Sequence, residues 1–145
     1  MNFKISLGLT DVLHLRNIQL LREVIGVHTC DRRSSKSSIE TRYKSKIPSS
    51  SLIFEPGFSD YDELWSPTER ESTDEQTIRL RAFLDDIVEQ CAWDRYTKRK
   101  DRIIFMSFSS HSGAIKSILR VLGHRPFRLE TGGVIPALVK IKKKS

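Results

Sequence analysis

The chain has 145 residues and a formal net charge of +7, with 38% hydrophobic and 30% charged residues. This length suits one domain of the usual size, about 100–150 residues. The composition excludes collagen, low-complexity disorder and a disulfide-rich miniprotein. The spacing of Cys30 and Cys91 makes neither a metal-binding pair nor a disulfide framework, so we expect free thiols in a reducing compartment.

The charges fall into three blocks. The net charge is +5 over residues 1–50, −8 over residues 51–92 and +10 over residues 93–145. The acidic block in the middle of the sequence argues against a nucleic-acid binder, whereas the basic blocks on either side of it suit an anionic substrate. We divide the chain into an N-terminal segment (1–19), a domain (20–141) and a solvated basic tail (142–145).

The first half of the chain gives few regular elements. Alternating apolar residues from Phe3 to Leu9 predict a short strand, and the apolar pattern up to Leu21 predicts a helix that begins at Thr10 or Asp11. Residues 30–52 are rich in Ser, Lys and Arg and predict a long loop. Residues 54–72 predict an irregular segment anchored by apolar side chains, namely Phe54, Phe58, Tyr61, Leu64 and Trp65.

The clearest predicted helix runs from Asp74 to about Trp93. Thr73 and Gln76 have the spacing of a capping box, and six residues form one apolar stripe: Leu80, Phe83, Leu84, Ile87, Val88 and Cys91. The basic run 95–102 then predicts a surface connection.

The last third predicts strand, turn, helix, turn and strand. Ile103–Phe108 is an apolar run typical of a buried strand, and Ala114–Leu122 has helical spacing ended by Gly123. Thr131–Gly133 predicts a turn and Val134–Ile141 a strand, in which Pro136 favours an edge position. This order of elements favours an α/β layered fold.

A candidate anion site lies between the strand at 103–108 and the helix that follows it. Ser112 and Gly113 would offer backbone N–H groups at a helix N-terminus, and His111 would stand beside them. The imidazole could then donate a hydrogen bond to a phosphoryl oxygen. The alternative is a turn histidine that caps the helix.

A second candidate is Glu23, which precedes several arginines. A carboxyl in such a place is a general acid if burial raises its pKa, and otherwise a salt-bridge partner. Spacing alone leaves both interpretations open.

Together these segments resemble the histidine phosphatase superfamily, also called phosphoglycerate mutase-like, and within it the fungal phosphomutase-like branch. The resemblance covers about Leu20 to Lys140. Five segments carry it: Leu21–Ser34, Phe54–Trp65, Glu69–Glu71, Phe108–Phe127 and Thr131–Pro136.

The resemblance implies a role for each matching residue. His111 matches the later histidine of the family's phosphate pocket, and Glu23 matches the acid that protonates the leaving oxygen. Arg32 or Arg33 matches a basic residue that contacts the substrate. Ser112 replaces a glycine that is common after that histidine, and it keeps the backbone donor beside Gly113.

One departure from the family bears on activity. The family's nucleophile is the histidine of an Arg-His-Gly motif at the end of the first strand, and this sequence has no Arg-His-Gly. The resemblance therefore implies a three-layer phosphoglycerate mutase-like α/β sandwich without its first strand. A chain without the acceptor histidine is expected to be a weak or inactive phosphomonoester hydrolase, because no phosphohistidine can form on it.

Two function classes follow. The first is this phosphatase-type domain, which acts on a phosphorylated small molecule or a phosphoprotein. The second is a non-catalytic binding or scaffold module for phosphorylated partners or nucleic acid. The four histidines lack metal-ligand spacing, and the chain has no hydrolase elbow, P-loop or dinucleotide motif, so we expect no metal and no cofactor. With no apolar run of roughly 20 residues and no signal peptide, we expect a cytoplasmic or nuclear protein that binds no membrane.

Overall fold

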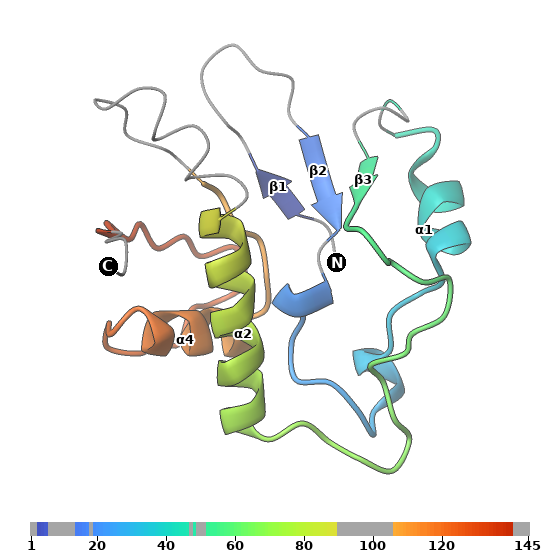
Figure 1. Cartoon of the computed structure of the whole chain (residues 1–145). Coiled ribbons are helices and arrows are strands. Elements are labelled where there is room, and N and C mark those ends of the chain that lie inside the picture. The colour runs from blue at the N-terminus through green and yellow to red at the C-terminus, as the bar shows by residue number, and fades with distance from the viewer. Residues whose placement is uncertain are drawn as a thin grey trace.

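The computed structural model describes residues 3–5, 14–17, 19–46, 48, 52–89 and 106–140. Its elements in chain order are β1 (Phe3–Ile5), β2 (His14–Asn17), the 3-10 helices η1 (Gln19–Leu21) and η2 (Thr29–Asp31), α1 (Lys36–Tyr43), β3 (Leu52–Phe54), α2 (Thr73–Ile87) and α4 (Ser112–Val121). Figure 1 shows α2 beside α4, with the small sheet between the upper end of α2 and α1, and α1 next to β3. Helices combined with a sheet make this an α/β fold.

The sheet has the strand order β1-β2-β3. β2 pairs antiparallel with β1 and parallel with β3, and the pairs Lys4↔Leu15 and Leu15↔Leu52 fix the register. The predicted strand is confirmed at Phe3–Ile5, while residues 6–9 lie outside the described residues. The predicted helix is wrong at His14–Asn17, because hydrogen bonds to a strand on each side override a short apolar pattern that suits helix and strand alike.

The prediction of one long loop over residues 30–52 is also wrong, because helix α1 lies within it. The Ser35 side chain caps the helix by accepting a hydrogen bond from the N–H of Ser38 at 3.1 Å, and Ile39 is buried. One N-cap and one apolar anchor thus suffice for two turns of helix within a polar sequence.

The predicted irregular segment is confirmed, since residues 55–72 form neither helix nor strand. Its anchors are only partly those expected. Phe58 is buried and its ring lies 4.8 Å from that of Phe54, but Tyr61 and Leu64 are 76% and 46% exposed. Aromatic composition therefore does not identify which rings are buried.

Helix α2 begins one residue earlier than predicted. Ser72 is the N-cap and forms a full capping box with Glu75, so the expected Thr73–Gln76 pairing is wrong by one position. Leu80, Phe83 and Ile87 form the buried stripe as predicted. The helix ends at Ile87, and residues 90–105, which include the predicted end at Trp93, Cys91 and the basic run 95–102, lie outside the described residues.

Helix α4 packs on α2 and completes the core. It begins two residues before the predicted Ala114–Leu122 helix and ends one residue before its predicted end, and Gly123 follows it with a φ of +71°. The buried cluster consists of Leu21, Leu80, Phe83, Ile87, Ala114 and Ile118. Since Leu21 belongs to it, the segment just before Glu23 is fixed against both helices.

Neither predicted strand of the last third is present where the structure describes the chain. Residues 106–108 are irregular, although Met106 and Phe108 pack against the core, and residues 103–105 lie outside the described residues. Residues 134–140 also pair with no strand among the described residues, and Leu138 is 99% exposed. The predicted turn is confirmed, because Gly132 has a φ of +79° and Gly133 N–H donates to the Glu130 carbonyl at 2.9 Å.

Candidate functional site

The Glu23 carboxylate lies on the N-terminus of α4. Its Oε2 accepts hydrogen bonds from the backbone N–H groups of Gly113, at 2.9 Å, and Ala114, at 3.3 Å. The first turn of a helix has unpaired N–H groups and a partial positive charge, both of which favour an anion. The N–H of Gly113, which the sequence assigns to a phosphate, is therefore occupied by a carboxylate of the chain itself.

The other oxygen of Glu23 is also hydrogen-bonded. Oε1 accepts from the N–H of Val24 and from Nε2 of Gln76, each at 3.0 Å. Burial raises the pKa of Glu23, but the hydrogen bonds from four amides outweigh it, and the pKa lies below its ordinary value of 4.5. The ionised carboxylate thus stabilises the fold above about pH 4.5, and this contribution is lost as the pH falls through the folded-state pKa.

The two sequence-based interpretations of Glu23 can be set beside its hydrogen bonds. Amides hold the carboxylate, and within the described residues no ion pair joins it to an arginine. Its pKa is lowered in this arrangement by the hydrogen bonds that it accepts, although burial raises it. The structure gives a third arrangement, a carboxylate anchored on a helix N-terminus.

His111 is the N-cap residue of α4 by backbone geometry. Its side chain makes no capping hydrogen bond, and the residue is exposed. The alternative of a turn histidine that caps the helix therefore holds for the backbone of His111, while its imidazole contributes no capping hydrogen bond. The ring stands at the same helix end that Glu23 occupies, next to the exposed Ser112.

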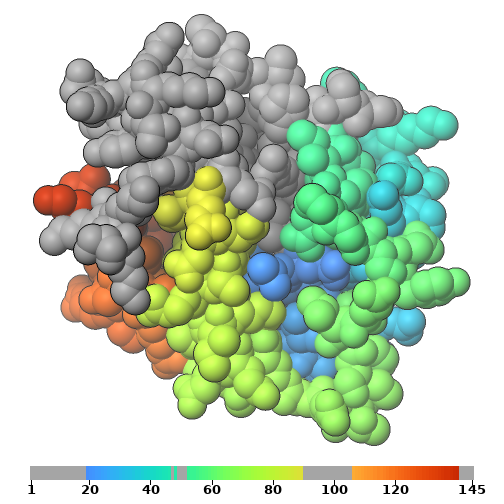
Figure 2. All heavy atoms as spheres, viewed as in Figure 1, coloured from blue at the N-terminus to red at the C-terminus, as the bar shows by residue number. Residues whose placement is uncertain are grey.

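The loop after Glu23 is fixed by segment 66–71. Glu71 N–H donates to the Ile25 carbonyl at 2.8 Å, and Val27 N–H donates to the Ser66 carbonyl at 2.7 Å. Gly26 between them has a φ of +105°, and a Cβ there would collide with the Glu69 carbonyl oxygen. In Figure 2 the blue surface just after residue 19 lies between α2 and the green residues 52–72, which hold it from both sides.

Arg32 and Arg33 lie in a separate cluster with residues 58–65. The Arg33 guanidinium donates to backbone carbonyls of Ser34, Ser59, Asp60 and Tyr61, and it covers the Phe58 ring. Arg32 is exposed and stacks over the Trp65 ring at 5.1 Å. Within the described residues, no hydrogen bond or ion pair joins either arginine to Glu23 or His111. Arg33 thus holds the irregular segment in place, and Arg32 keeps an exposed guanidinium.

Sequence reasoning missed the residues that support Glu23. Gln76 and Ser117 are each 2% exposed, and Arg79 donates hydrogen bonds to the carbonyls of Leu20, Arg22 and Glu23. A signal was available, because Gln76 stands four residues before Leu80 on the apolar stripe of α2. A polar residue on a core-facing stripe needs a buried partner.

Among the described residues, no helix combines the length and the apolar character required to cross a bilayer. The same part of the chain holds no group of three or more His, Cys, Asp or Glu residues that could bind a metal ion.

Replacing Gly113 by alanine is expected to displace the Glu23 carboxylate from α4 while the fold persists. A Cβ at this position would collide with the Glu23 carboxylate, which is the end of a flexible side chain and can move. The carboxyl then loses amide donors, and its pKa rises toward the ordinary value. Carboxyl-detected ¹³C NMR would measure this in Gly113→Ala, with Ser112→Ala as the control because Ser112 is exposed at the same helix end and loses only its hydroxyl. An unchanged Glu23 titration would contradict the contact.

The chain is similar to several known proteins. It is 48% identical over 124 residues to "Probable phosphoglycerate mutase" of Arthroderma benhamiae, covering 86% of this chain and 32% of that protein. It is 33% identical over 131 residues to "Probable phosphoglycerate mutase PMU1" of Saccharomyces cerevisiae, covering 87% and 42%. It is 32% identical over 124 residues to "Phosphomutase-like protein 3" of Candida albicans, covering 86% and 35%.

The chain thus spans about a third to two fifths of the length of these relatives. No family model matches it, and no solved structure does. The similarities nevertheless agree with the family to which its motifs point. The chain belongs to the histidine phosphatase, or phosphoglycerate mutase-like, superfamily, and its relatives include fungal phosphomutase-like proteins.

Proposed function

We propose that the chain is the part of a histidine phosphatase-type phosphomonoester hydrolase that carries the later histidine and the acid of the pocket. One observation carries the proposal. Glu23 Oε2 lies 2.9 Å from the N–H of Gly113, a residue 90 positions later in the sequence and two positions after His111. This contact supports one pocket for both family-implied roles, because His111 is the N-cap residue of the helix whose first N–H groups Glu23 accepts from.

The chemistry of this helix end suits a phosphomonoester. The α4 N-terminus carries a partial positive charge, and the exposed His111 imidazole becomes a cationic donor when it is protonated. A phosphoryl oxygen can accept a hydrogen bond from it in the manner that the family implies. For Glu23 to protonate a leaving oxygen, its carboxyl must first take up a proton and give up part of its hydrogen bonding.

The sequence also limits what the chain does by itself. Its 145 residues include no Arg-His-Gly, so the covalent transfer to a histidine that the family uses has no such acceptor here. We propose slow turnover or none for these residues alone. The architecture that accompanies the function is a three-layer α/β sandwich, to which the sheet, α2 and α4 would contribute.

The test measures phosphate binding separately from turnover. Inorganic phosphate is titrated into the 145-residue chain with ³¹P NMR detection, and p-nitrophenyl phosphate hydrolysis is followed in parallel. We expect His111→Ala to weaken phosphate binding by about 10- to 150-fold, because a charge-assisted hydrogen bond contributes about 1.5–3 kcal/mol. His124→Ala is the matched control, since His124 is an equally exposed histidine whose Nδ1 lies near the Arg125 carbonyl oxygen.

Two results would contradict the proposal. Equal phosphate affinity in the parent, His111→Ala and His124→Ala would remove His111 from the pocket. Rapid hydrolysis by the parent chain, lost in His111→Ala, would show that no further acceptor histidine is needed.

The second candidate function is a non-catalytic module that binds phosphorylated partners. It is favoured by the saturated hydrogen bonding of Glu23, which leaves the carboxylate an acceptor in this arrangement. Binding of phosphate through His111 without any hydrolysis, also after Glu23→Gln, would favour this module. A steep fall of nucleic-acid affinity with salt would point to nucleic acid instead.

A further inference from the structure

Two buried polar side chains connect the helices of the core to Glu23. Gln76 on α2 and Ser117 on α4 are each 2% exposed, and their neighbours in the core are apolar. A buried polar group without a partner costs about 1–3 kcal/mol, so such residues are hydrogen-bonded in folded proteins. In this molecule, hydrogen bonds connect Ser117 to Gln76 and Gln76 to Glu23.

The donor and the acceptor of each of these hydrogen bonds are fixed. Ser117 Oγ donates to Oε1 of Gln76 at 2.8 Å, and Nε2 of the same amide donates to Oε1 of Glu23 at 3.0 Å. If the amide were flipped, its oxygen would face the carboxylate, and two acceptors would repel each other. The hydroxyl of Ser117 therefore orients Gln76, and Gln76 orients Glu23.

The carboxylate has its full set of donors. A carboxylate offers about four lone-pair positions, and Glu23 receives hydrogen bonds from Val24, Gln76, Gly113 and Ala114. A proton on either oxygen would face one of these N–H groups. The arrangement thus favours an acceptor-only carboxylate in one rotamer.

Building on the proposed function, we propose that Gln76 and Ser117 are positioning residues for Glu23. They act through the buried chain of hydrogen bonds and hold the carboxylate ionised on the α4 N-terminus beside His111. Neither residue needs to touch the substrate for this role.

The charged groups around Glu23 decide which variants are informative. From α2, Arg79 donates to the Glu23 backbone carbonyl at 3.2 Å and is itself paired with Glu71. From α4, His111 stands at the helix N-cap. Gln76 and Ser117 are uncharged, so Ser117→Ala changes no charge near Glu23. Gln76→Glu adds one negative charge, at the position where Nε2 of Gln76 now donates to Glu23.

The test titrates the Glu23 carboxyl by ¹³C NMR in the 145-residue chain, with the signal assigned from Glu23→Gln. Gln76→Glu keeps the shape of the side chain but replaces the donor with a second carboxylate. We expect the titration midpoint of Glu23 to rise by about one pH unit or more, because two carboxyls that face each other share a proton. Ser117→Ala should raise it less, since Gln76 keeps its donor but loses its fixed orientation.

Thr77→Ala is the control on α2, because the Thr77 hydroxyl donates only within its own helix, to the Thr73 carbonyl at 2.7 Å. It should leave the midpoint unchanged. If Gln76→Glu and Ser117→Ala lower the melting temperature but also leave the Glu23 midpoint unchanged, the two residues only fill space and the proposal is wrong. If Gln76→Glu does not fold, Ser117→Ala decides alone.

The titration does not depend on phosphate binding, so the two proposals can fail separately. A midpoint that moves in a chain that binds no phosphate would keep the positioning role and reject the proposed function. A Glu23 midpoint that stays the same in the variants, while His111→Ala still loses phosphate binding, would reject the positioning role and keep the proposed function.

Discussion

Replacing Arg79 by leucine is expected to lower the free energy of unfolding by about 3–5 kcal/mol. Arg79 donates two hydrogen bonds to the Glu71 carboxylate at 2.6 Å each, and both side chains are nearly buried, with exposed fractions of 11% and 12%. The substitution leaves the Glu71 charge buried without its partner. It also removes the donor for three backbone carbonyls at the end of η1.

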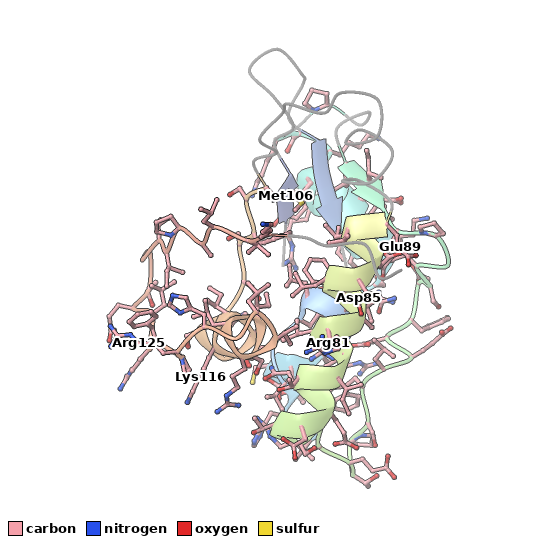
Figure 3. All side chains as sticks on the ribbon, turned by 60° about the vertical axis from the view of Figure 1, so that its left-hand side comes forward. Arg81, Asp85, Glu89, Met106, Lys116 and Arg125 are labelled. Carbon is pink, nitrogen blue, oxygen red and sulfur yellow. The ribbon has the colours of Figure 1, made fainter. Side chains whose placement is uncertain are left out.

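Arg81→Leu is the matched control, because Arg81 is exposed on the same helix. Figure 3 shows Arg81 along α2 together with Asp85 and Glu89, and all three residues are exposed. Urea unfolding should place this control within about 0.5 kcal/mol of the parent. The double variant Arg79→Leu, Glu71→Gln should recover part of the loss, because it removes the unpaired charge. Equal stability of Arg79→Leu and Arg81→Leu would contradict the structural role of the buried pair.

The sequence predicts the two helices that carry the site but not the contacts that Glu23 makes with them. Helices α2 and α4 follow from local signals, namely caps, apolar stripes and the glycine at position 123, and they agree with the structure to within two residues at their N-termini. Helix stripes are local, so periodicity detects them. The environment of Glu23 depends on contacts across more than 50 residues, to Gln76 and to Gly113, which no local pattern records.

Two of the wrong predictions share one physical cause. β2 was expected to be a helix, and residues 134–140 were expected to be a strand. A strand is stable only where a neighbour accepts its hydrogen bonds, so β2 forms between β1 and β3, whereas 134–140 has no such neighbour among the described residues. The apolar pattern was misleading in both places, because it does not record whether a partner strand is present.

Glu23 shows how a family role and a local environment can differ. The resemblance assigns it the role of proton donor, yet the hydrogen bonds around it stabilise the ionised form and its pKa is lowered. A phosphoryl group that approaches the same helix end also carries negative charge and would compete for the N–H groups of Gly113 and Ala114. We therefore expect phosphate binding to raise the pKa of Glu23, since a nearby anion favours the protonated carboxyl.

The second large effect is expected for Phe83→Ala, which should lower the free energy of unfolding by about 3–5 kcal/mol. Phe83 is fully buried in the cluster shared by α2 and α4, and its ring meets that of Phe108 edge-on at 5.4 Å. Truncation removes the buried ring and leaves a cavity between the helices. Because Glu23 reaches α4 only when α2 and α4 stay packed together, the variant should also raise the Glu23 pKa toward its ordinary value.

Ile78→Ala provides the contrast for Phe83→Ala, since Ile78 is on the same helix but 69% exposed. Its unfolding free energy should change by less than about 1 kcal/mol, with the same dependence on urea as the parent. Phe83→Leu should fall between the two, because leucine keeps part of the apolar volume but loses the contact with the Phe108 ring. If Phe83→Ala and Ile78→Ala unfold at the same urea concentration, α2 and α4 do not share this core. The meeting of Glu23 with the α4 N-terminus would then lose its structural basis.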